Sequence, residues 1–421
     1  MKISLYSFSI TKFPISSNPK IGNFSNLPTD IVLDIITRLP TESILDCKLV
    51  CEPWKYLVSQ HPSFYQTYLT HLNHSTADSG KLNFLVFSMH TCKLYHFDLD
   101  EKHDDEETPT HRTRRINFTL PFVCHICRII GSINGLVCLY GGNDETVCVC
   151  NPFTREYVML PKIYRKDHYV YWSCGFGYLP ATNEYKVVVL NTLMGGFDFM
   201  EVVVYTLGSG NGWRTVETLD IHLAKVYIEF ERGVFVNGAV HWRDRLGGKV
   251  LAFDLTKEKF SGLLSPPPCP SILREPSGIG IGVFGGVLYY ATSQRRWCDI
   301  WLLKKKTDIG DMEEQVEHEP LDWSKEFSLP CSPRIDEPLA FTKTGSVLYF
   351  SPRSIRIYDA VASTPKTLVD FTRLSLFNRI FPHKVTLLSL KELGEENVQV
   401  MQPAAIEEAG TLDLASKHLA R

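Results

Sequence analysis

The chain has 421 residues, of which 44% are hydrophobic and 22% charged, with a formal net charge of −3. This length accommodates two or three ordinary domains with a substantial core, and the composition is typical of a folded globular protein. A nearly balanced charge gives no reason to expect nucleic acid or an acidic membrane as a partner. The longest apolar stretch, Ile126–Tyr140, is interrupted by polar residues and is too short to cross a bilayer.

Twelve cysteines are spread along the chain, and no secretory signal is recognisable before them. Reduced thiols in the cytoplasm or nucleus are therefore favoured over a disulfide framework. Residues 1–23 contain Lys2, Lys12 and Lys20 and no acid, but Ser, Thr and Pro interrupt every apolar run. We predict a flexible N-terminal segment over residues 1–23, and an organelle transit peptide remains the alternative.

Residues 27–71 have the apolar periodicity of helices. The first predicted helix carries a wide apolar stripe whose members lie three or four residues apart, namely Ile31, Val32, Ile35, Ile36 and Leu39. Pro28 suits its first position, and Pro40 ends it. Thr41 is predicted to cap a second helix over 42–48. Further helices are predicted from residues 49–50 to 58, with Pro53 in the first turn, and over 62–72.

So many apolar side chains cannot all be buried within about 45 residues, because small units bury too little of their surface. Periodicity alone leaves two interpretations open. The excess apolar surface belongs to the first part of one larger core, or it is a face that another polypeptide covers.

The pattern of this segment resembles an F-box, over residues 24–72. The motif elements that carry the resemblance are Leu27-Pro28, Asp30, Ile31 to Ile36, Arg38-Leu39-Pro40, Val50-Cys51, Trp54 and Pro62-Ser63-Phe64. Glu52 and Pro53 depart from the family, in which a basic and a small residue usually lie between Cys and Trp; this departure leaves the affinity for the linker open. The resemblance implies docking to a Skp-type linker subunit, and through it to a cullin scaffold. The candidate linker-binding residues are Leu27, Pro28, Ile31, Val32, Ile35, Leu39, Pro40, Val50 and Trp54.

After a polar break at residues 74–81 the pattern changes to short runs rich in Val, Ile, Tyr, Phe and Leu, separated by turn residues. A turn with glycine precedes an apolar strand four times, at Asn134-Gly135, Asn237-Gly238, Gly285-Gly286 and Thr344-Gly345. A second motif, such as Leu251–Asp254, ends on what we expect to be an outer strand. Helical periodicity returns only at 385–393.

Units of about 40 to 60 residues with four strands each are typical of a β-propeller. We predict about six blades over residues 84–380, and a β-sandwich with long loops is the alternative. The order of motifs also resembles the F-box-associated domain of plant F-box proteins, which implies a kelch-like propeller. The motifs that carry this resemblance include Gly131 to Leu136, Asn151 to Thr154, Gly175 to Tyr178, Val236 to Gly238 and Asp299 to Trp301. The tail, residues 393–421, resembles nothing in the family and is a candidate for disorder.

Three patterns with chemical potential are interpreted as structural. Gly280 to Gly285 has the letters of a dinucleotide-binding loop, but a strand and not a helix is predicted after it. Cys124 and Cys127 have half the spacing of a zinc site, which Cys148 and Cys150 complete poorly, so buried thiols are favoured. We therefore predict no catalytic residue, no metal and no cofactor.

The sequence thus predicts a mainly β protein, a kelch-like propeller behind a small helical F-box. The function implied is substrate recognition in an SCF-type ubiquitin ligase, without catalysis by this chain, in the cytoplasm or nucleus. Loops of a propeller are where specificity is expected, and the candidate substrate-binding residues are Asn143, Tyr169, Trp172, Phe197, Arg243, Arg245, Arg295 and Trp297. The alternatives are a scaffold outside the ubiquitin system and an enzymatic or sugar-binding propeller. The substrate and the pathway are not predicted.

Overall fold

The computed structural model of the chain contains two compact units, Met1–Ser75 and Thr76–Arg421. The structure describes residues 27–39, 41–48, 50–61, 63–64, 67–68, 70–71, 81–88, 93–100, 110–116, 119–120, 127–141, 146–163, 169–193, 199–221, 228, 232–245, 248–268, 280–294, 297–305, 321–330, 337–342, 344–351, 353–359, 364–371 and 378–402. The predicted N-terminal segment, residues 1–23, lies outside these ranges. Within them, no helix has the length and apolar character needed to span a membrane.

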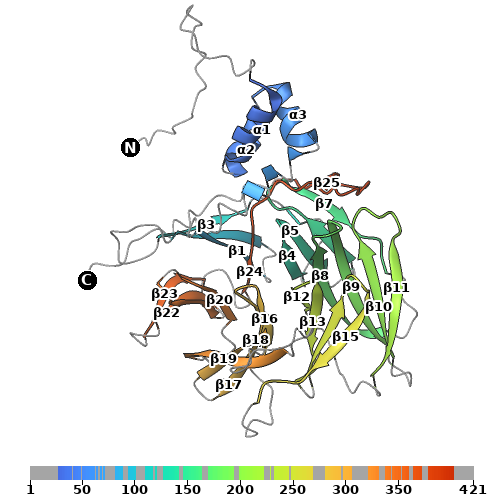
Figure 1. Ribbon diagram of the computed structural model, residues 1–421, viewed down its shortest axis with the longest axis vertical. Helices are drawn as coiled ribbons and strands as arrows, with labels where there is room; N and C mark the ends of the chain where they lie inside the picture. Colours follow the sequence, from blue (N-terminus) through green and yellow to red (C-terminus); the bar gives the residue numbers. More distant parts are fainter. Residues whose placement is uncertain are drawn as a thin grey trace, which may run out of the picture. The chain divides into compact units, whose positions relative to one another are not determined.

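The first unit is a small helical module (Figure 1). Its helices are α1 (Thr29–Thr37), α2 (Thr41–Cys47) and α3 (Glu52–Gln60). Pro28 precedes α1, and its carbonyl oxygen accepts hydrogen bonds from the amides of Ile31 and Val32. Pro53 lies in the first turn of α3, where its missing N–H leaves no hydrogen bond unmade. These three predicted helices are therefore confirmed, with starts that differ by one to three residues.

The predicted fourth helix is described only in part. Phe64, Thr67 and Tyr68 have helical backbone, and the ring of Tyr68 is buried. Its hydroxyl lies 2.6 Å from the hydroxyl of Thr41, the first residue of α2. Thr41 was expected to cap that helix from outside. Instead it belongs to the helix and connects its first turn to this last segment of the module.

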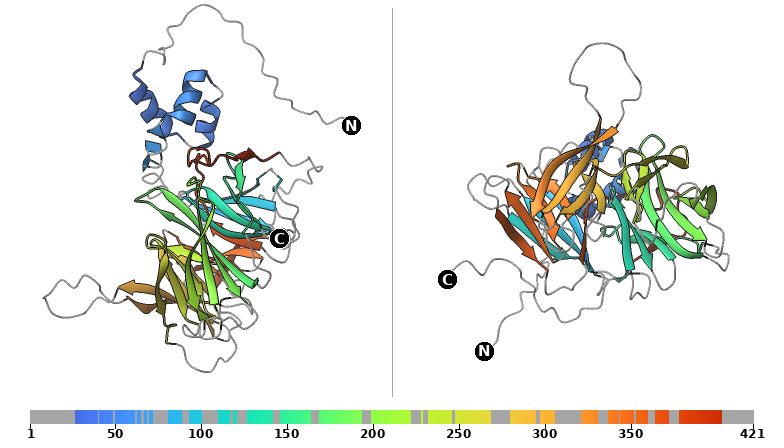
Figure 2. Two further views of the ribbon diagram at one scale, coloured as in Figure 1. Left: turned by 90° about the vertical axis from the view of Figure 1, so that its right-hand side faces the viewer. Right: turned by 90° about the horizontal axis from the view of Figure 1, so that it is seen from below.

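The second unit is a six-bladed β-propeller (Figure 2). The described strands form six antiparallel sheets of four strands or, in one case, five. Going from the centre outwards, the first blade contains β24 (Asn378–Pro382), β1 (Lys81–Ser88), β2 (Lys93–Asp100) and β3 (Thr110–Arg115). The second blade contains β4 (Cys127–Ile133), β5 (Leu136–Gly141), β6 (Thr146–Cys150), β7 (Glu156–Met159) and β25 (Gln399–Val400).

The remaining blades each use four consecutive strands. The third contains β8 (Tyr169–Leu179), β9 (Glu184–Leu193), β10 (Phe199–Thr206) and β11 (Trp213–Asp220). The fourth contains β12 (Val234–Val236), β13 (Ala239–Arg243), β14 (Val250–Asp254) and β15 (Lys259–Leu264). The fifth contains β16 (Gly280–Phe284), β17 (Val287–Gln294), β18 (Trp297–Lys305) and β19 (Leu321–Pro330). The sixth contains β20 (Glu337–Phe341), β21 (Val347–Ser351), β22 (Ser354–Asp359) and β23 (Thr364–Asp370).

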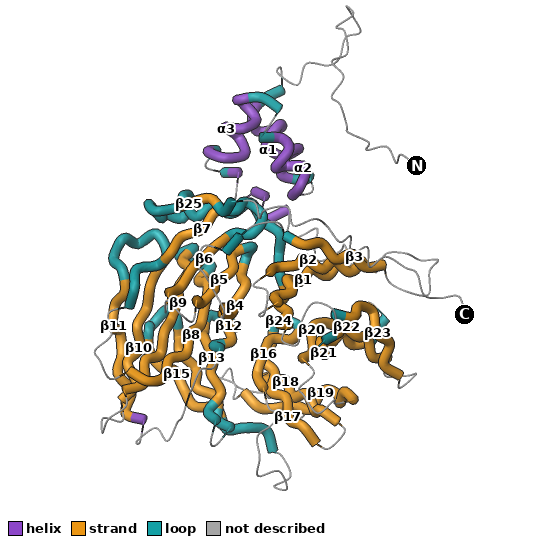
Figure 3. Tube along the Cα trace, turned by 180° about the vertical axis from the view of Figure 1, so that it is seen from behind, coloured by secondary structure: helices purple, strands orange, loops and turns teal. Residues whose placement is uncertain are grey.

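The inner strands follow one another around the centre in the order β24, β4, β8, β12, β16 and β20 (Figure 3). The ring closes because β24, near the end of the chain, pairs with β1, the first strand of the propeller. Apolar clusters fill the interfaces between blades. One of them joins Leu348 and Phe350 of the sixth blade to Phe84 and Ile380 of the first. Closure therefore depends on sequence-distant side chains packing in one core.

The alternation of strand direction gives the propeller two distinct ends. The loop face, as we call it, carries the connections between the second and third strands of each blade and the connections between blades. The turn face carries the connections between first and second strands and between third and fourth strands. The predicted glycine turns lie on the turn face, and Asn134, Gly135, Asn237 and Gly238 all have positive φ, as this type of turn requires.

One prediction about the strands is wrong. The motif that ends at Asp254 was expected on an outer strand, but β14 is the third strand of its blade, and β15 is the outermost. The same holds for β18, which contains Asp299 to Trp301. In the sequence these strands look like the last strand of each repeat. The fourth strand that lies outside each of them is largely polar and gives little apolar signal.

The chain beyond β24 also differs from expectation. Residues 385–389 have no regular secondary structure and 390–394 form turns, so the helical periodicity over 385–393 does not indicate a helix. Residues 393–402 are part of the folded propeller rather than a disordered tail, since β25 pairs with β7 and Met401 is buried. We call residues 383–402 the C-terminal strap. The rest of the predicted tail, 403–421, lies outside the described residues.

The strap lies on the turn face of the second and third blades. The amide of Asn151 donates to the carbonyl oxygens of Thr386 and Leu388, at 3.0 Å each. Further along, the carboxylate of Glu395 accepts a hydrogen bond from the amide of Gly208, at 2.8 Å, in the turn between β10 and β11. Leu387, Leu388 and Leu390 are buried in between. The strap therefore connects two neighbouring blades.

Replacing Gly135 with alanine is expected to lower the free energy of unfolding by about 3 kcal/mol, from a clash and a strained φ together. Gly135 has φ of 85°, and an added Cβ would lie 1.9 Å from Oγ1 of Thr386 in the strap. Gly286→Ala is the matched control, because its φ is also positive but its Cβ would meet nothing within 4 Å. The control should cost about 1 kcal/mol, measured by urea denaturation. Equal losses for the two variants would contradict the proposed strap contact.

Candidate binding surfaces

Helix α1 has an exposed apolar face. Ile31 is 47% exposed and Ile35 39%, four residues apart and hence on the same side of the helix. Leu27, 39% exposed, precedes them by the same spacing. We call Leu27, Pro28, Ile31, Ile35, Val50 and Tyr56, all exposed, the exposed apolar set of the helical module. Exposed apolar residues at helical spacing are typical of surfaces that another protein covers.

The opposite side of α1 forms the core of the module. Val32, Leu33 and Ile36 are buried there, together with Ile44 of α2 and Leu57 of α3. Val32 was a candidate for linker binding, but it is only 6% exposed and lies in this core. The periodicity could not separate the two sides, because the five apolar residues of α1 spread over more than half of the helix surface. Only packing against α2 and α3 decides which residues remain outside.

The other candidates of the module have varied positions. Val50 is 63% exposed and Pro28 is exposed, whereas Leu39 and Trp54 are half-buried. Pro40 lies outside the described residues. Tyr56, 53% exposed on α3, was missed, and its only signal in the sequence is a large aromatic residue on the polar side of a short helix.

Charged residues border the exposed apolar set. Both carboxylate oxygens of Asp34 accept hydrogen bonds from Arg38, at 2.9 Å. The hydrogen bond from Arg38 is the main reason why the pKa of Asp34 lies below its ordinary value, and His71, 3.3 Å away, adds to it. All three groups are solvent-accessible, so this cluster contributes little to stability.

On the propeller, the five predicted recognition loops all lie on the loop face. Four connect second to third strands, and the fifth connects β7 to β8. Asn143, Phe197 and Arg295 lie outside the described residues. Tyr169 and Trp172 lie within the first four residues of strand β8, but their side chains are outside the described part as well. The topology therefore brings together loops that are far apart in sequence.

Three of the candidate substrate-binding residues have described side chains. Trp297, at the start of β18, is 47% exposed, and Arg245 is exposed. Arg243 is buried, because it ends β13 beside the buried Asp244, and it is not positioned to meet a macromolecule at the surface. Phe199 and Leu263 were missed: both are large, apolar and more than a third exposed at strand ends on this face.

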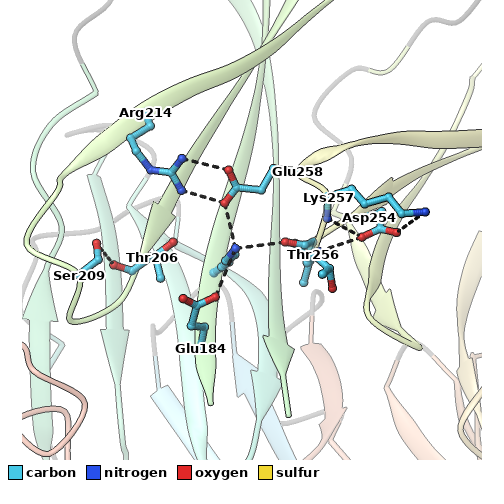
Figure 4. A network of polar contacts seen from close by, with 10 residues as sticks. Glu184, Thr206, Ser209, Arg214, Asp254, Thr256, Lys257 and Glu258 are labelled. Carbon is cyan, nitrogen blue, oxygen red and sulfur yellow. Dashed lines mark hydrogen bonds and ion pairs between the residues drawn. The ribbon is translucent and has the colours of Figure 1, made fainter. Parts of the chain in front are cut away.

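The turn face of the third and fourth blades carries a paired polar network instead (Figure 4). Arg214 donates two hydrogen bonds to Glu258, at 2.8 and 3.0 Å. The ammonium of Lys186 donates to Glu258 at 2.9 Å and to the carbonyl oxygen of Leu255 at 3.1 Å. The bond from Arg214 is the largest cause of the lowered pKa of Glu258, although burial opposes it. Glu184, whose carboxylate lies 3.4 Å from the same ammonium, brings the network to two positive and two negative charges, so it joins two blades rather than forming a reactive site.

His383, the first residue of the strap, is enclosed at the junction of the first two blades. Its Nδ1 lies 2.8 Å from the hydroxyl of Ser132, and its ring stacks on Phe153. Burial, assisted by the nearby His96, lowers the pKa of His383 to about 3. Nδ1 of His96 in turn lies 2.9 Å from the carboxylate of Asp98. His383 is therefore neutral in the folded protein at any physiological pH.

Because of His383, we expect the folded protein to lose stability as the pH falls. Between the folded pKa of about 3 and the ordinary value of 6.5, the unfolded chain binds a proton that the folded protein does not. The contribution of neutral His383 to the free energy of unfolding is complete above pH 6.5 and is lost as the pH falls towards 3. His383→Gln should therefore show a smaller drop in Tm between pH 7.5 and pH 5 than the wild type. An equal drop in both proteins would exclude His383 as the cause.

The cysteines of the second blade are buried thiols. Burial raises the pKa of Cys148 and of Cys138, and their thiol neighbours, Cys150 and Cys174, raise it further. In the described part of the chain, no three His, Cys, Asp or Glu residues are grouped so as to hold a metal ion. Cys124 lies outside that part. Gly280 to Gly285 has the letters of a dinucleotide loop, but Gly280–Phe284 is strand β16, and a hairpin leads from it into strand β17, as predicted.

Comparisons with known proteins match both units. Residues 24–66 match the F-box domain, and residues 83–274 match the F-box associated beta propeller domain. The F-box protein DOR of Arabidopsis thaliana is 26% identical over 295 residues, covering 67% of this chain and 71% of the relative. The F-box protein CPR1 of the same plant is 26% identical, covering 67% of this chain and 70% of the relative.

Solved structures give weaker similarity. The crystal structure of a nidogen/laminin complex covers 71% of this chain and 97% of its own, at 12% identity and a TM-score of 0.35. At this score the match adds nothing to the fold described above. The two domain matches and the plant relatives therefore carry the comparison.

Proposed function

Because the chain combines an F-box domain with an F-box associated β-propeller domain, as plant F-box proteins do, we propose that it is the substrate-recognition subunit of an SCF-type ubiquitin ligase. In this proposal the F-box binds a Skp-type linker, which connects the chain to a cullin. The propeller binds a protein substrate. The chain itself performs no chemistry, and ubiquitin is transferred by an enzyme recruited elsewhere on the scaffold.

The exposed apolar set of the helical module is the observation that supports linker docking most directly. A scaffold protein outside the ubiquitin system would need no such face. Ile31 and Ile35 nevertheless present branched aliphatic side chains to solvent, at a cost that a partner would recover by covering them. The paired Asp34 and Arg38 at the edge suit the polar rim that surrounds an apolar interface core.

The mechanism of such a receptor is proximity. Holding a substrate and an ubiquitin-loaded enzyme on one scaffold raises their effective concentration without any bond chemistry in the receptor. A rigid propeller suits this role, since six blades closed by β24 fix the loop face relative to the core. We propose substrate contacts on the loop face, at the exposed residues Trp297, Arg245, Phe199 and Leu263.

Two finer expectations belong to this proposal. The described cysteines are free thiols, which suits the cytoplasm or nucleus, where thiols are kept reduced. The kelch-like character of the propeller, implied by the resemblance, stays a prediction. Pro53, which departs from the F-box pattern, lies in the first turn of α3 and so leaves that helix intact.

Co-purification tests the proposal. The wild type is expected to capture a co-expressed Skp-type linker, whereas Leu27→Ala/Pro28→Ala should lose most of it, because truncating an interface anchor costs about 2 kcal/mol or more of binding. Circular dichroism and thermal unfolding establish that both proteins are folded. If folded wild-type protein captures no linker, the receptor function is wrong.

A further inference from the structure

β3, at the outer edge of the first blade, differs from the outer strands of the other blades. In the third to sixth blades, the outermost strand pairs with its neighbour through an irregular register, with a shift at Val202/Val203, Ala252/Phe253, Ile300/Trp301 and Ile355/Arg356. In the second blade, β25 pairs with the edge of β7. β3 instead keeps a continuous register with β2 over all six of its residues, and no described strand lies beyond it (Figure 3). Since bulges and covering strands hinder further pairing, β3 is the edge among the described strands that is open to another chain.

The backbone of β3 presents hydrogen-bonding groups on its outer side. The amide of Ile116, directly after β3, donates to the carbonyl oxygen of Leu94 in β2, at 2.9 Å. Hydrogen-bonded pairs alternate along antiparallel strands, so residues 110, 112 and 114 direct their backbone groups towards β2 as well. The N–H and C=O of Thr113, in the middle of the edge, therefore point away from β2. An extended segment can pair with this side of the strand, as β25 does at β7.

The residues of β3 are basic. The strand, Thr-His-Arg-Thr-Arg-Arg, has three arginines and no acid, whereas the outer strands β11, β19 and β23 each contain at least one acid. Arg112 and Arg115 are exposed. Asp98 lies opposite Arg112 on β2, but its carboxylate is 2.9 Å from Nδ1 of the buried His96, so this acid is directed into the blade. The open edge thus carries positive charge.

This charge restricts which strand can pair with the edge. A second copy of β3 would bring arginines opposite one another, which is unfavourable. Charged side chains on an edge strand also discourage pairing with neutral segments that would otherwise aggregate there. A segment with acidic residues at alternate positions would instead place several carboxylates on one face, at the short cross-strand distance from the arginines. Charge complementarity therefore favours an acidic, extended partner.

We propose that the edge of β3 binds an extended, acidic segment of the polypeptide substrate as an additional strand of the first blade. This inference rests on the proposed substrate-recognition function and adds a second contact surface to the loop-face residues. In strand addition the main-chain hydrogen bonds provide affinity and alternate side chains provide specificity. The edge accordingly selects a class of substrate, polypeptides with an acidic stretch that can become extended.

Titration calorimetry with the purified full chain tests this proposal. The main probe is a nine-residue peptide in which Glu alternates with Val or Thr, and a second peptide has Gln in place of each Glu. A third peptide keeps every Glu but has N-methylated backbone amides, so it retains the charge and loses the N–H donors. Wild type should bind the Glu peptide about tenfold more tightly than the Gln peptide, as two or three surface ion pairs allow. The N-methylated peptide should not bind.

Two pairs of variants locate the site. Thr113→Pro should abolish binding of the Glu peptide, because proline removes the outward N–H and places its ring at the edge. The pairing with β2 does not use this N–H, and proline is tolerated on edge strands in that position. Thr113→Val is the matched control, which keeps the N–H and should bind like wild type.

The second pair tests the charge. Arg112→Glu should weaken binding of the Glu peptide at least fivefold, because repulsion replaces attraction. Arg353→Glu is its matched control, at an exposed arginine in the connection between β21 and β22, and should bind like wild type. The comparison of the three peptides on unmodified protein keeps the test decisive if Thr113→Pro does not fold.

The proposal is overturned if wild type binds the Glu peptide no more tightly than the Gln peptide, or binds the N-methylated peptide equally well. Equal binding by folded Thr113→Pro and Thr113→Val also overturns it. A single-stranded oligonucleotide that binds more tightly than the Glu peptide would assign the edge to nucleic acid instead. A dimer in sedimentation that Thr113→Pro dissociates would assign it to a second copy of the chain. Linker capture is read separately: lost peptide binding with retained capture rejects the β3 site alone, whereas absent capture by folded wild type rejects the receptor function.

Discussion

Replacing Ile31 with aspartate is expected to weaken linker binding at least a hundredfold while the propeller keeps its stability. Ile31 is 47% exposed in the middle of the apolar face of α1. An anchor in such a position contributes about 2 kcal/mol or more, and a carboxylate without a partner in an apolar interface adds a desolvation cost of similar size. Fluorescence anisotropy or calorimetry with purified linker gives the dissociation constant.

The matched control is Leu263→Asp, which places the same charge on an exposed leucine of the propeller. It should bind the linker like wild type. Because Ile31 is exposed, its replacement should leave the Tm of the helical module nearly unchanged, whereas Ile36→Asp, at a buried position of the same helix, should unfold it. If Ile31→Asp binds the linker normally, docking does not use this face of α1.

Replacing Trp242 with alanine is expected to lower the free energy of unfolding by about 3 to 5 kcal/mol. Trp242 is fully buried in the apolar cluster between the third and fourth blades. Its ring lies so close to Gly233 and Gly175 that a Cβ at either position would approach it within 3.0 Å. The cavity left by the indole cannot collapse, because both blades are fixed by their own sheets. Urea denaturation measures the loss.

Trp242→Phe separates the loss of ring packing from the loss of the indole N–H. The indole N–H makes no hydrogen bond with the described residues, so phenylalanine removes a buried donor without a partner while retaining most of the ring. It should cost less than half as much as alanine. Equal costs would mean that the indole N–H has a partner, such as a buried water molecule, which phenylalanine also removes.

Much of the propeller was predictable because its signals are local. The hairpin turns at Asn134-Gly135 and Asn237-Gly238 need positive φ, and few residues other than glycine and asparagine adopt it. Short apolar runs between such turns predict strands, and their spacing predicts blades. The error about the third strand has the same origin: outer strands such as β15 are mostly exposed and carry little apolar signal.

The C-terminal strap could not be predicted in this way. Its residues have no secondary structure of their own apart from two residues of β25. Leu388 and Leu390 are buried because they meet turns from blades more than 150 residues earlier in the chain, and Asn151 satisfies the strap's carbonyl groups. A helical spacing of apolar residues at 385–393 was therefore misleading, since tertiary contacts and not backbone hydrogen bonds select these positions.

The sequence by itself determined the order of domains, the type of secondary structure and the motifs that resemble an F-box, because these depend on spacing along the chain. Only the tertiary structure decided which side of α1 is exposed, since helix packing buries Val32 and leaves Ile31 outside. It also decided that Arg232 meets Phe381, about 150 positions later, because pairing of β24 with β1 brings the end of the chain back to the first blade.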